Sequence, residues 1–373
     1  MKKTVAGIFN LYHASLATRS FSDDYSRVAI YGAGNIGKDV YEALWNRCIP
    51  VEFFLDRKAC PGDTWKGVPI LQPDDSALSM TDRERVNVII AILNPEVDIS
   101  VVGKTLSDLG YTQVTNLVRF YDHFGDVLGD RFWLTSRSFY EPLESVLSEG
   151  LSVWADASSR QLFLSNLEYR MTGNAGCLPL PDNRHQYFPP DLPRWQSPIR
   201  FIDCGAYHGD TLASILDAGF EIEAALEFEP DQENFRKLLN FVNNRKLSSV
   251  YLWPCAVFSS TTKIHFHEGK GEASRLSNSG EVIIQGVALD EVVPKFNPSL
   301  IKMDIEGAEY EALLGARNLI CESRPGLAIS VYHQPAHLWS LAHLLLEWNA
   351  GYKLYLRSHA YNGFELVMYA IPF

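Results

Sequence analysis

The sequence is poor in the features that mark secreted, membrane-spanning and nucleic-acid-binding proteins. Its 373 residues include only six cysteines, with no Cys-x-x-Cys pair or other metal-like spacing. No run of about 18 or more apolar residues occurs, so we expect no membrane span. Acidic residues outnumber basic ones by 45 to 33, and this balance argues against nucleic acid as the main partner. The first residues suit a secretion signal poorly, so we expect a cytoplasmic protein with reduced thiols.

The chain contains two openings of the type strand, glycine loop, helix. The first runs from Arg27 to Gly37 and the second from Ile199 to Gly209, and each begins an alternation of short apolar strands and amphipathic helices. Strands on either side of Asn362-Gly363 predict a closing antiparallel hairpin. We therefore expect an α/β protein with two Rossmann-like doubly wound domains, divided into an N-terminal arm (1–26), a first domain (27–125), a helical connector with a Pro-rich loop (126–198) and a second domain (199–373).

The first glycine loop has the spacing of a nucleotide-binding loop. Gly32, Gly34 and Gly37 follow a predicted strand, and Asp56 lies 19 residues after Gly37, where an acid would meet ribose hydroxyls. A nucleotide, dinucleotide or nucleotide-sugar could bind here. The same glycines would equally permit tight helix–strand packing with nothing bound. The chain has no recognisable hydride-transfer site, which disfavours a dehydrogenase.

The second glycine loop has the opposite electrostatics. Asp203 precedes its glycines and Asp210 follows Gly209, so phosphate would be repelled and a cationic ligand favoured. Glu229 ends the next predicted strand, 20 residues after Gly209, where it could accept the hydroxyls of a ribose. An acid, glycines and a second acid in this order suit a nucleoside that carries an amino-acid cation. S-adenosylmethionine fits this description.

A third acidic segment follows at residues 300–307. Strand alternation would place Lys302, Asp304 and Glu306 on one face and the intervening apolar residues on the other. Such charges are costly to bury without a ligand or partners. An internal network of Lys302 with carboxylates, or a solvent-facing strand end, is the alternative explanation.

Three motifs in this order resemble the FkbM-type methyltransferase family over about residues 199–373. They are Phe201-Ile-Asp-Cys-Gly-Ala-Tyr-His-Gly-Asp210, Phe228-Glu-Pro-Asp231 and Ile301-Lys-Met-Asp-Ile-Glu-Gly-Ala-Glu309. The resemblance implies a class I fold that uses S-adenosylmethionine, usually for O-methylation and often of sugar hydroxyls. The first glycine loop resembles the nucleotide- or nucleotide-sugar-binding domains attached to carbohydrate-modifying enzymes.

Carried over by position, the resemblance implies a set of cofactor-binding residues around the second loop. They are Asp203, Gly205, Ala206, Gly209, Asp210, Glu229 and Pro230. The segment that starts at Asp304 would lie beside the transferring methyl group. A base that accepts the acceptor's proton would help the transfer, and the candidates are Asp304, Glu306 and His333, the last having the most suitable ordinary pKa. Asp304 and Glu306 could alternatively hold a divalent cation such as Mg²⁺.

The expected function is S-adenosylmethionine-dependent O-methylation of a small-molecule or carbohydrate acceptor. The alternative is a nucleotide- or nucleotide-sugar-binding protein with an inactive methyltransferase-like domain, although a dead site need not keep four costly carboxylates. Residues 272–280 read as a loop that could close over the substrate. The sequence does not indicate the oligomeric state.

Overall fold

The structure is a computed structural model of the chain that describes residues 3–17, 26–267, 275–276 and 282–373. Its contacts divide the chain into two compact units. The first comprises Met1–Ser152, Arg160–Pro181 and Ala360–Phe364, and the second Val153–Ser159, Asp182–His359 and Glu365–Phe373. Both contain a mainly parallel sheet with helices, so the predicted α/β class is confirmed. The four-segment division of the sequence stays a prediction.

The first unit contains a six-stranded sheet in the order β3-β4-β2-β1-β5-β6, parallel except for β3. Its strands are β1 (Val28–Tyr31), β2 (Val51–Leu55), β3 (Thr64–Trp65), β4 (Val68–Leu71), β5 (Asn87–Ile90) and β6 (Gln113–Asn116). The helices between and after them are α2 (Asn35–Asn46), α3 (Met80–Arg85), α4 (Ile99–Asp108) and α5 (Leu117–Leu128). The strands β1 and β5 are buried throughout, as their continuous apolar runs require.

The remaining helices of the N-terminal half are α1 (Val5–Ala17), α6 (Glu144–Ser152) and α7 (Ala157–Thr172), with 3-10 turns at Arg137–Leu143 and Ala175–Cys177. Arg137 lies at the start of the first of these turns and is buried. Its guanidinium pairs with Asp122 in the middle of α5 and donates to the carbonyl of Met171. These contacts connect the 3-10 turn at Arg137–Leu143 with α5 and α7.

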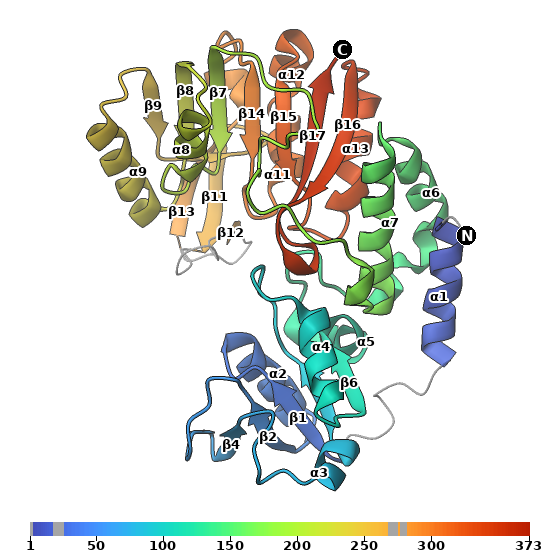
Figure 1. Cartoon of the computed structure of the whole chain (residues 1–373). Helices are drawn as coiled ribbons and strands as arrows, with labels where there is room; N and C mark the ends of the chain where they lie inside the picture. Colours follow the sequence, from blue (N-terminus) through green and yellow to red (C-terminus); the bar gives the residue numbers. More distant parts are fainter. Residues whose placement is uncertain (1–2, 18–25, 268–274, 277–281) are drawn as a thin grey trace. The chain divides into compact units, whose positions relative to one another are not determined.

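The second unit contains a seven-stranded sheet in the order β16-β17-β15-β14-β7-β8-β9 (Figure 1). Its strands are β7 (Ile199–Cys204), β8 (Ile222–Phe228), β9 (Val250–Trp253), β14 (Leu300–Met303), β15 (Gly326–Ser330), β16 (Tyr352–Ser358) and β17 (Leu366–Pro372). Its neighbouring strands β15, β14, β7, β8 and β9 are parallel, whereas β17 is antiparallel to both β15 and β16. The predicted closing hairpin is thus confirmed, with residues 359–365 as its connection.

Helices connect these strands, and the chain between β9 and α10 forms a second, small sheet. The helices are α8 (Asp210–Asp217), α9 (Gln232–Arg245), α10 (Leu289–Val292), α11 (Glu309–Leu314), α12 (Arg317–Ser323) and α13 (His337–Glu347). The small sheet has the order β10-β13-β11-β12 and is formed by β10 (Ala256–Val257), β11 (Thr262–His267), β12 (Arg275–Leu276) and β13 (Val282–Val287). The expected substrate-covering loop, residues 272–280, lies almost wholly outside the described residues.

The order of the large sheet reverses between β7 and β14. From β7 the chain builds β8 and β9 on one side and then returns to build β14 and β15 on the other. In open α/β sheets, ligands bind at the carboxyl ends of the strands beside such a switch point. The topology therefore draws attention to the residues that follow β7, β8 and β14.

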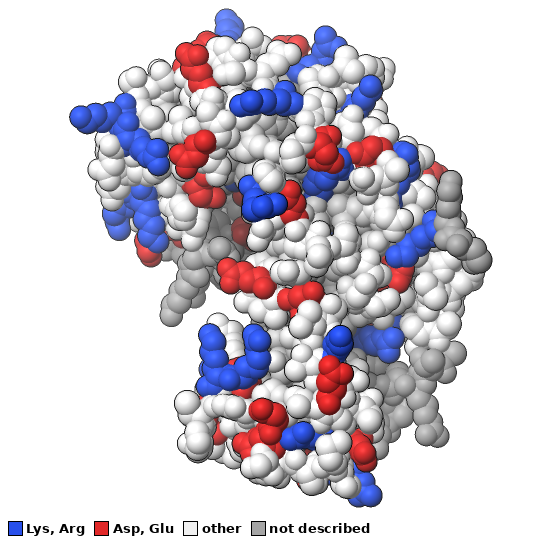
Figure 2. Space-filling model, in the orientation of Figure 1, with Lys and Arg blue, Asp and Glu red and all other residues white. Residues whose placement is uncertain are grey.

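None of the described helices is long and apolar enough to cross a membrane. All six cysteines are free thiols. On the face of the second unit in the upper part of Figure 2, basic and acidic side chains alternate rather than forming one basic surface.

Candidate active site

A row of three buried charged residues crosses the large sheet next to its apolar core. Leu300, Phe201 and Ala225 are register neighbours on β14, β7 and β8 and belong to one buried apolar cluster. Two residues further along, on the same face, Lys302 lies beside Asp203, and Asp203 beside Glu227. Each of the three is at most 4 % exposed. This face of the sheet thus changes from apolar to charged one step before the strands end.

Lys302 connects this row to the glycine loop. Its Nζ lies 3.0 Å from Oδ1 of Asp203 and donates to the carbonyl of Gly205 at 2.6 Å. Burial raises the pKa of Asp203 to about 7, although Lys302 opposes the shift. Both carboxyl oxygens of Glu227 are buried without a hydrogen-bond partner among the described residues, and burial raises the pKa of Glu227 well above its ordinary value. One ammonium group therefore faces two carboxyl groups, of which Glu227 holds its proton.

The glycine loop approaches the end of β14 very closely. Gly205 has a φ of +89°, and a Cβ atom there would lie 2.0 Å from the carbonyl oxygen of Asp304. Gly209, with a φ of +90°, precedes α8, and a Cβ there would lie 2.7 Å from the ring of Phe241 and 3.2 Å from the side chain of Leu238. Ala206 is fully buried, whereas Asp210 in the first turn of α8 is exposed. Gly205 is thus needed because no side chain fits between the two strand ends, and Gly209 because of its positive φ and its contact with Phe241.

Glu229 follows β8 and is held by the backbone. Its Oε2 accepts the N–H of Tyr207 in the glycine loop at 2.8 Å, and its Oε1 accepts the N–H of Asp231 at 2.8 Å, across Pro230. Burial raises the pKa of Glu229 to about 7, against these two hydrogen bonds. The carboxyl group is thus fixed beside the loop, and its role with ribose hydroxyls stays a prediction.

The segment after β14 corrects the strand predicted over residues 300–307. The strand ends at Met303, and Glu306 (φ +54°) and Gly307 (φ +104°) form a tight turn. Lys302 therefore lies in the buried row, while Asp304 and Glu306 belong to the turn and do not share a strand face with it. The alternation rule failed because Glu309 stabilises the turn, its Oε1 accepting the N–H of Ile305 at 2.9 Å.

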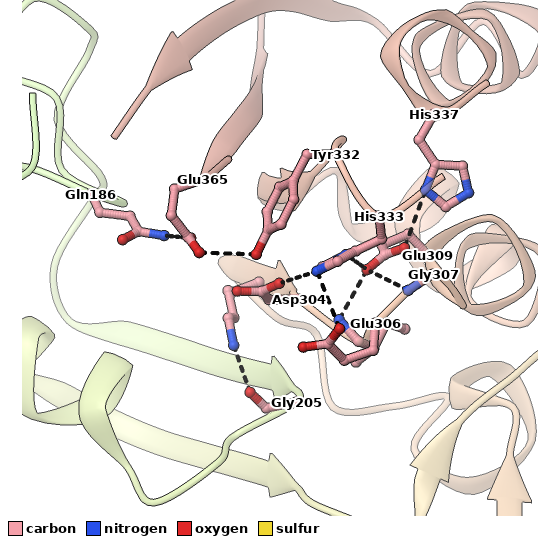
Figure 3. Close-up of polar contacts among 12 residues, drawn as sticks. Gln186, Gly205, Asp304, Glu306, Gly307, Glu309, Tyr332, His333, His337 and Glu365 are labelled. Atoms are coloured by element: carbon pink, nitrogen blue, oxygen red, sulfur yellow. Dashed lines mark hydrogen bonds and ion pairs between the residues drawn. The ribbon is translucent and has the colours of Figure 1, made fainter. Parts of the chain in front are cut away.

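A buried ion-pair network lies on this turn (Figure 3). His333 follows β15, and its Nδ1 lies 2.7 Å from Oε1 of Glu309, at the start of α11. Its Nε2 faces Oδ1 of Asp304 at 3.4 Å and Oε2 of Glu306 at 3.8 Å. Nδ1 of His337, at the start of α13, lies 3.2 Å from Oε2 of Glu309. The structure therefore brings the three predicted catalytic candidates together.

The charges in this network change the role expected of His333. Burial alone would lower its pKa, but the carboxyl groups of Glu309, Glu306 and Asp304 raise it to about 10. The pKa of Glu309 is held well below its usual range by His333 and His337, despite burial. Burial raises the pKa of Glu306 to about 8, although its side chain is 29 % exposed. His333 is thus a buried cation at neutral pH, and Glu306 is the group whose proton can move.

A second carboxyl group, Glu365, lies next to this network at the start of β17. It accepts hydrogen bonds from the hydroxyl of Tyr332 at 2.9 Å and from the amide of Gln186 at 2.6 Å (Figure 3). The hydroxyl of Tyr187 donates to Oδ2 of Asp304 at 3.3 Å. Burial raises the pKa of Glu365 to about 7. Gln186 and Tyr187 come from the Pro-rich segment, which contributes none of the site residues predicted above.

Sequence reasoning missed several residues of this site. Glu309 stands at the end of the third motif, but nothing marked its side chain as buried. His333 and His337 have helical spacing that Pro335 makes doubtful. His333 lies before α13 and His337 is its first residue. Both histidines contact the carboxyl group of Glu309, which lies between them. Glu365 follows Asn362-Gly363, and the sequence around it indicated a hairpin turn but no functional role for this side chain.

The predicted nucleotide loop lies in the first unit, between β1 and α2. Gly32 has a φ of +105°, and a Cβ at Gly37 would lie 1.8 Å from the carbonyl oxygen of Gly32, so packing explains both glycines. At Gly34 a Cβ would meet nothing within 4 Å. Asp56 accepts the N–H groups of Ala33 at 3.1 Å and of Lys58 at 2.9 Å, as Glu229 does with its own loop. Nucleotide binding here stays a prediction.

Asp304, Glu309 and His333 each offer a ligand atom, and these atoms lie within 4.8 Å of one another. The chemistry of the group nevertheless fits a divalent cation poorly. Both ring nitrogens of His333 face carboxyl groups that hold it as a cation, and a metal would have to displace a proton from it.

Comparison with known proteins agrees with this geometry. Residues 203–355 match the family model of the Methyltransferase FkbM domain, which confirms the predicted resemblance. The structure of methyltransferase FkbM from Methylobacillus flagellatus KT is similar, with a TM-score of 0.79 at 20 % identity over 98 % of this chain and 100 % of that one. The second unit thus has the fold of an FkbM-type, S-adenosylmethionine-dependent methyltransferase. No curated protein sequence matches the chain.

Two further structures match shorter parts at low TM-scores. A SAM-dependent methyltransferase from Aquifex aeolicus has a TM-score of 0.28 at 14 % identity, over 60 % of this chain and 97 % of that one. Aeropyrum pernix fibrillarin, solved with S-adenosylmethionine, has a TM-score of 0.27 at 14 % identity, over 46 % of this chain and 66 % of that one.

Proposed function

We propose that the chain is an S-adenosylmethionine-dependent O-methyltransferase that acts on a hydroxyl group of a small-molecule or carbohydrate acceptor. The observation that carries the proposal is the position of Asp304 and Glu306, whose turn touches the glycine loop through Gly205 and contacts the cation His333. A carboxyl group poised to take a proton lies beside the loop where the family holds its cofactor.

The residues present fit S-adenosylmethionine. The carboxyl groups around the loop favour a ligand with ammonium and sulfonium charges, and Glu229 can accept ribose hydroxyls with its remaining lone pairs. Asp203, Gly205, Ala206, Gly209, Asp210, Glu229 and Pro230 would hold the ligand. When bound, it supplies a methyl group activated by the positive sulfur.

In this mechanism Glu306 is the general base. A hydroxyl is a poor nucleophile while it keeps its proton, and a positioned base accelerates such a step by roughly 10²–10⁴-fold. Glu306 is partly exposed and can reach an acceptor, and its pKa of about 8 makes it a stronger base than an ordinary carboxylate. His333 orients Asp304 and Glu306, while Glu309 and His337 keep His333 charged and fixed. His333 is therefore a positioning residue and not the base.

The proposal is tested by incubating the protein with methyl-labelled S-adenosylmethionine and a panel of neutral sugars and small hydroxyl compounds. An O-methyl ether keeps the label in alkali, whereas a methyl ester loses it. Label in an alkali-stable, nitrogen-free product that disappears in Glu306→Gln supports the proposal. Label that is confined to amines or esters contradicts it.

The location and the metal requirement belong to the same proposal. Six free thiols suit a reducing compartment, and we infer a cytoplasmic location on that basis. Because His333 is held as a cation, we expect prolonged treatment with EDTA to leave methyl transfer unchanged. Loss of transfer that Mg²⁺ restores would contradict this expectation.

The alternative, a nucleotide- or nucleotide-sugar-binding protein with an inactive second unit, is favoured by one observation. Gly34 has an ordinary φ and open space around it, so the fold does not require glycine there and a phosphate group could approach its backbone. Binding of a nucleoside diphosphate with no binding of S-adenosylhomocysteine would favour this alternative.

A further inference from the structure

Five carboxyl groups gather around the strand ends of the second unit, and the cations beside them are already engaged. Asp203, Glu229, Asp304, Glu306 and Glu365 follow or end β7, β8 and β14 or begin β17. Lys302 is bound to Asp203 and to the carbonyl of Gly205, and His333 to Glu309. Ionisation of all five would leave the site with surplus negative charge that its own cations do not balance.

In the protein alone, part of this surplus is removed by protonation. Burial raises the pKa of Asp203, Glu229 and Glu365 to about 7 and that of Glu306 to about 8. Near neutral pH these groups therefore hold an appreciable share of their protons. A ligand that brings a fixed positive charge changes this balance.

We propose that the site binds the charged cofactor with release of protons from its own carboxyl groups, and so distinguishes S-adenosylmethionine from S-adenosylhomocysteine increasingly as pH rises. This inference rests on the proposed function and concerns Glu306 and Glu365 first. A positive charge about 6 Å from a carboxyl group lowers its pKa by roughly one to two units at an effective dielectric constant near 20. S-adenosylhomocysteine has the same other groups but no charge on sulfur, so it lacks this effect.

The surroundings of both acids favour such a response. Glu306 faces His333 from the segment after β15, Asp304 from its own turn, Glu309 from α11 and Glu365 from β17. Glu365 faces Asp304, Tyr332, Gln186 and His333. His333 is the only cation among the neighbours named here, and its attraction to Glu306 and Glu365 is opposed by the other carboxyl groups. Both acids therefore respond to an added positive charge.

The positive charge of the cofactor would thus also prepare the base for the reaction. Binding ionises Glu306 before the acceptor reacts, so the base is formed together with the methyl donor. In the transfer, the acceptor oxygen forms a bond to the methyl carbon, the carbon–sulfur bond breaks with its electron pair left on sulfur, and the hydroxyl proton passes to the ionised Glu306. The positive charge on sulfur and the negative charge on Glu306 disappear together, which removes the attraction that held the ligand.

Isothermal titration calorimetry of the full chain with each ligand at pH 5.5 and pH 7.0 tests the proposal. With shifts of one to two units in both acids, the ratio of Kd for S-adenosylhomocysteine to Kd for S-adenosylmethionine should rise by roughly ten- to a hundredfold between these values. Titrations in two buffers of different ionisation enthalpy should show more protons released with S-adenosylmethionine, by about one proton near pH 7. A constant ratio with equal proton release would overturn the inference while leaving the proposed function intact.

Variants show which carboxyl groups release the protons on binding. Glu306→Gln and Glu365→Gln should each reduce the change in the ratio, whereas Glu347→Gln, at an exposed position of α13, should keep it. A full change in both site variants would overturn the assignment to these acids, and the proton count in the unchanged protein remains decisive if a variant does not fold. Failure of both ligands to bind would overturn the proposed function itself.

Discussion

At the residue scale, the chemistry depends on which group of the cluster can exchange a proton. His333 has the side chain most often used as a base, yet its neighbours hold it as a cation, and this leaves Glu306. We expect kcat/KM for S-adenosylmethionine, which reports the protein without ligand, to rise with pH and to level off above about 8. Glu306→Gln should lower kcat by roughly 10²–10⁴-fold and abolish this dependence. The measurement is a pH–rate profile of both proteins.

The control for that experiment is binding. Glu306→Gln should still bind S-adenosylhomocysteine, because the substituted side chain keeps its size and the glycine loop does not depend on it. A variant that retains the activity and pH profile of the original protein would assign the base to another residue, with Asp304 as the next candidate.

Glu227 is a second residue with a measurable consequence, because it is fully buried and has no hydrogen-bond partner in the part of the chain that the structure describes. The pKa of Glu227 is raised in the folded protein, so folding favours its protonated form. Its contribution to the free energy of unfolding is therefore fully present below the ordinary pKa of about 4.5 and is lost as pH rises toward the folded value. Glu227→Gln removes the ionisable group. Its melting temperature relative to the original protein should therefore increase from pH 5 to pH 8. A difference that is independent of pH would show that Glu227 is ionised when folded.

At the scale of elements, the close contact between the glycine loop and the β14 turn organises the site. Gly205→Ala would place a Cβ 2.0 Å from the carbonyl oxygen of Asp304, so the two strand ends must separate. We expect a loss of about 2–4 kcal/mol in the free energy of unfolding and weaker binding of S-adenosylhomocysteine. Chemical denaturation and calorimetry measure these two quantities.

Gly219 provides the matched control, because its φ is +77° and a Cβ there would meet nothing within 4 Å. Gly219→Ala carries only the cost of a positive φ, about 1 kcal/mol, and should leave ligand binding unchanged. Equal effects of the two substitutions would contradict the account of the contact between the loop and the turn.

The elements also show what the sequence could predict. Strands β7, β8 and β14 were predictable because their apolar alternation is followed by glycines or acids, and the acids at their ends mark the site. The turn at Glu306 was not, because it depends on Glu309, which is four residues from Ile305 in the turn and buried by α11 and α13. The contribution of Gln186 and Glu365 was hidden for a similar reason. The two residues are 179 positions apart, and only the folded chain brings them together.

At the scale of the whole molecule, the chain carries two glycine loops that are built alike and differ in charge. In each unit, an acid after the second strand accepts an N–H group of the loop, Glu229 from Tyr207 and Asp56 from Ala33. The loop of the second unit is surrounded by carboxyl groups. The loop of the first lacks an acid in the first turn of its helix and is followed by Lys38. We therefore expect a cationic nucleoside to prefer the loop of the second unit and a phosphorylated one to prefer the loop of the first.

The most direct test of the central claim is the thermal stabilisation of the purified protein by S-adenosylhomocysteine, with nucleoside diphosphates and NAD for comparison. At about 100 times its Kd a ligand adds roughly 2.7 kcal/mol to the free energy of unfolding, which is readily seen as a melting shift. The account predicts a shift with S-adenosylhomocysteine that is lost in Glu229→Ala and kept in Asp56→Ala. No shift with this ligand, together with a clear shift produced by a nucleoside diphosphate, would contradict it.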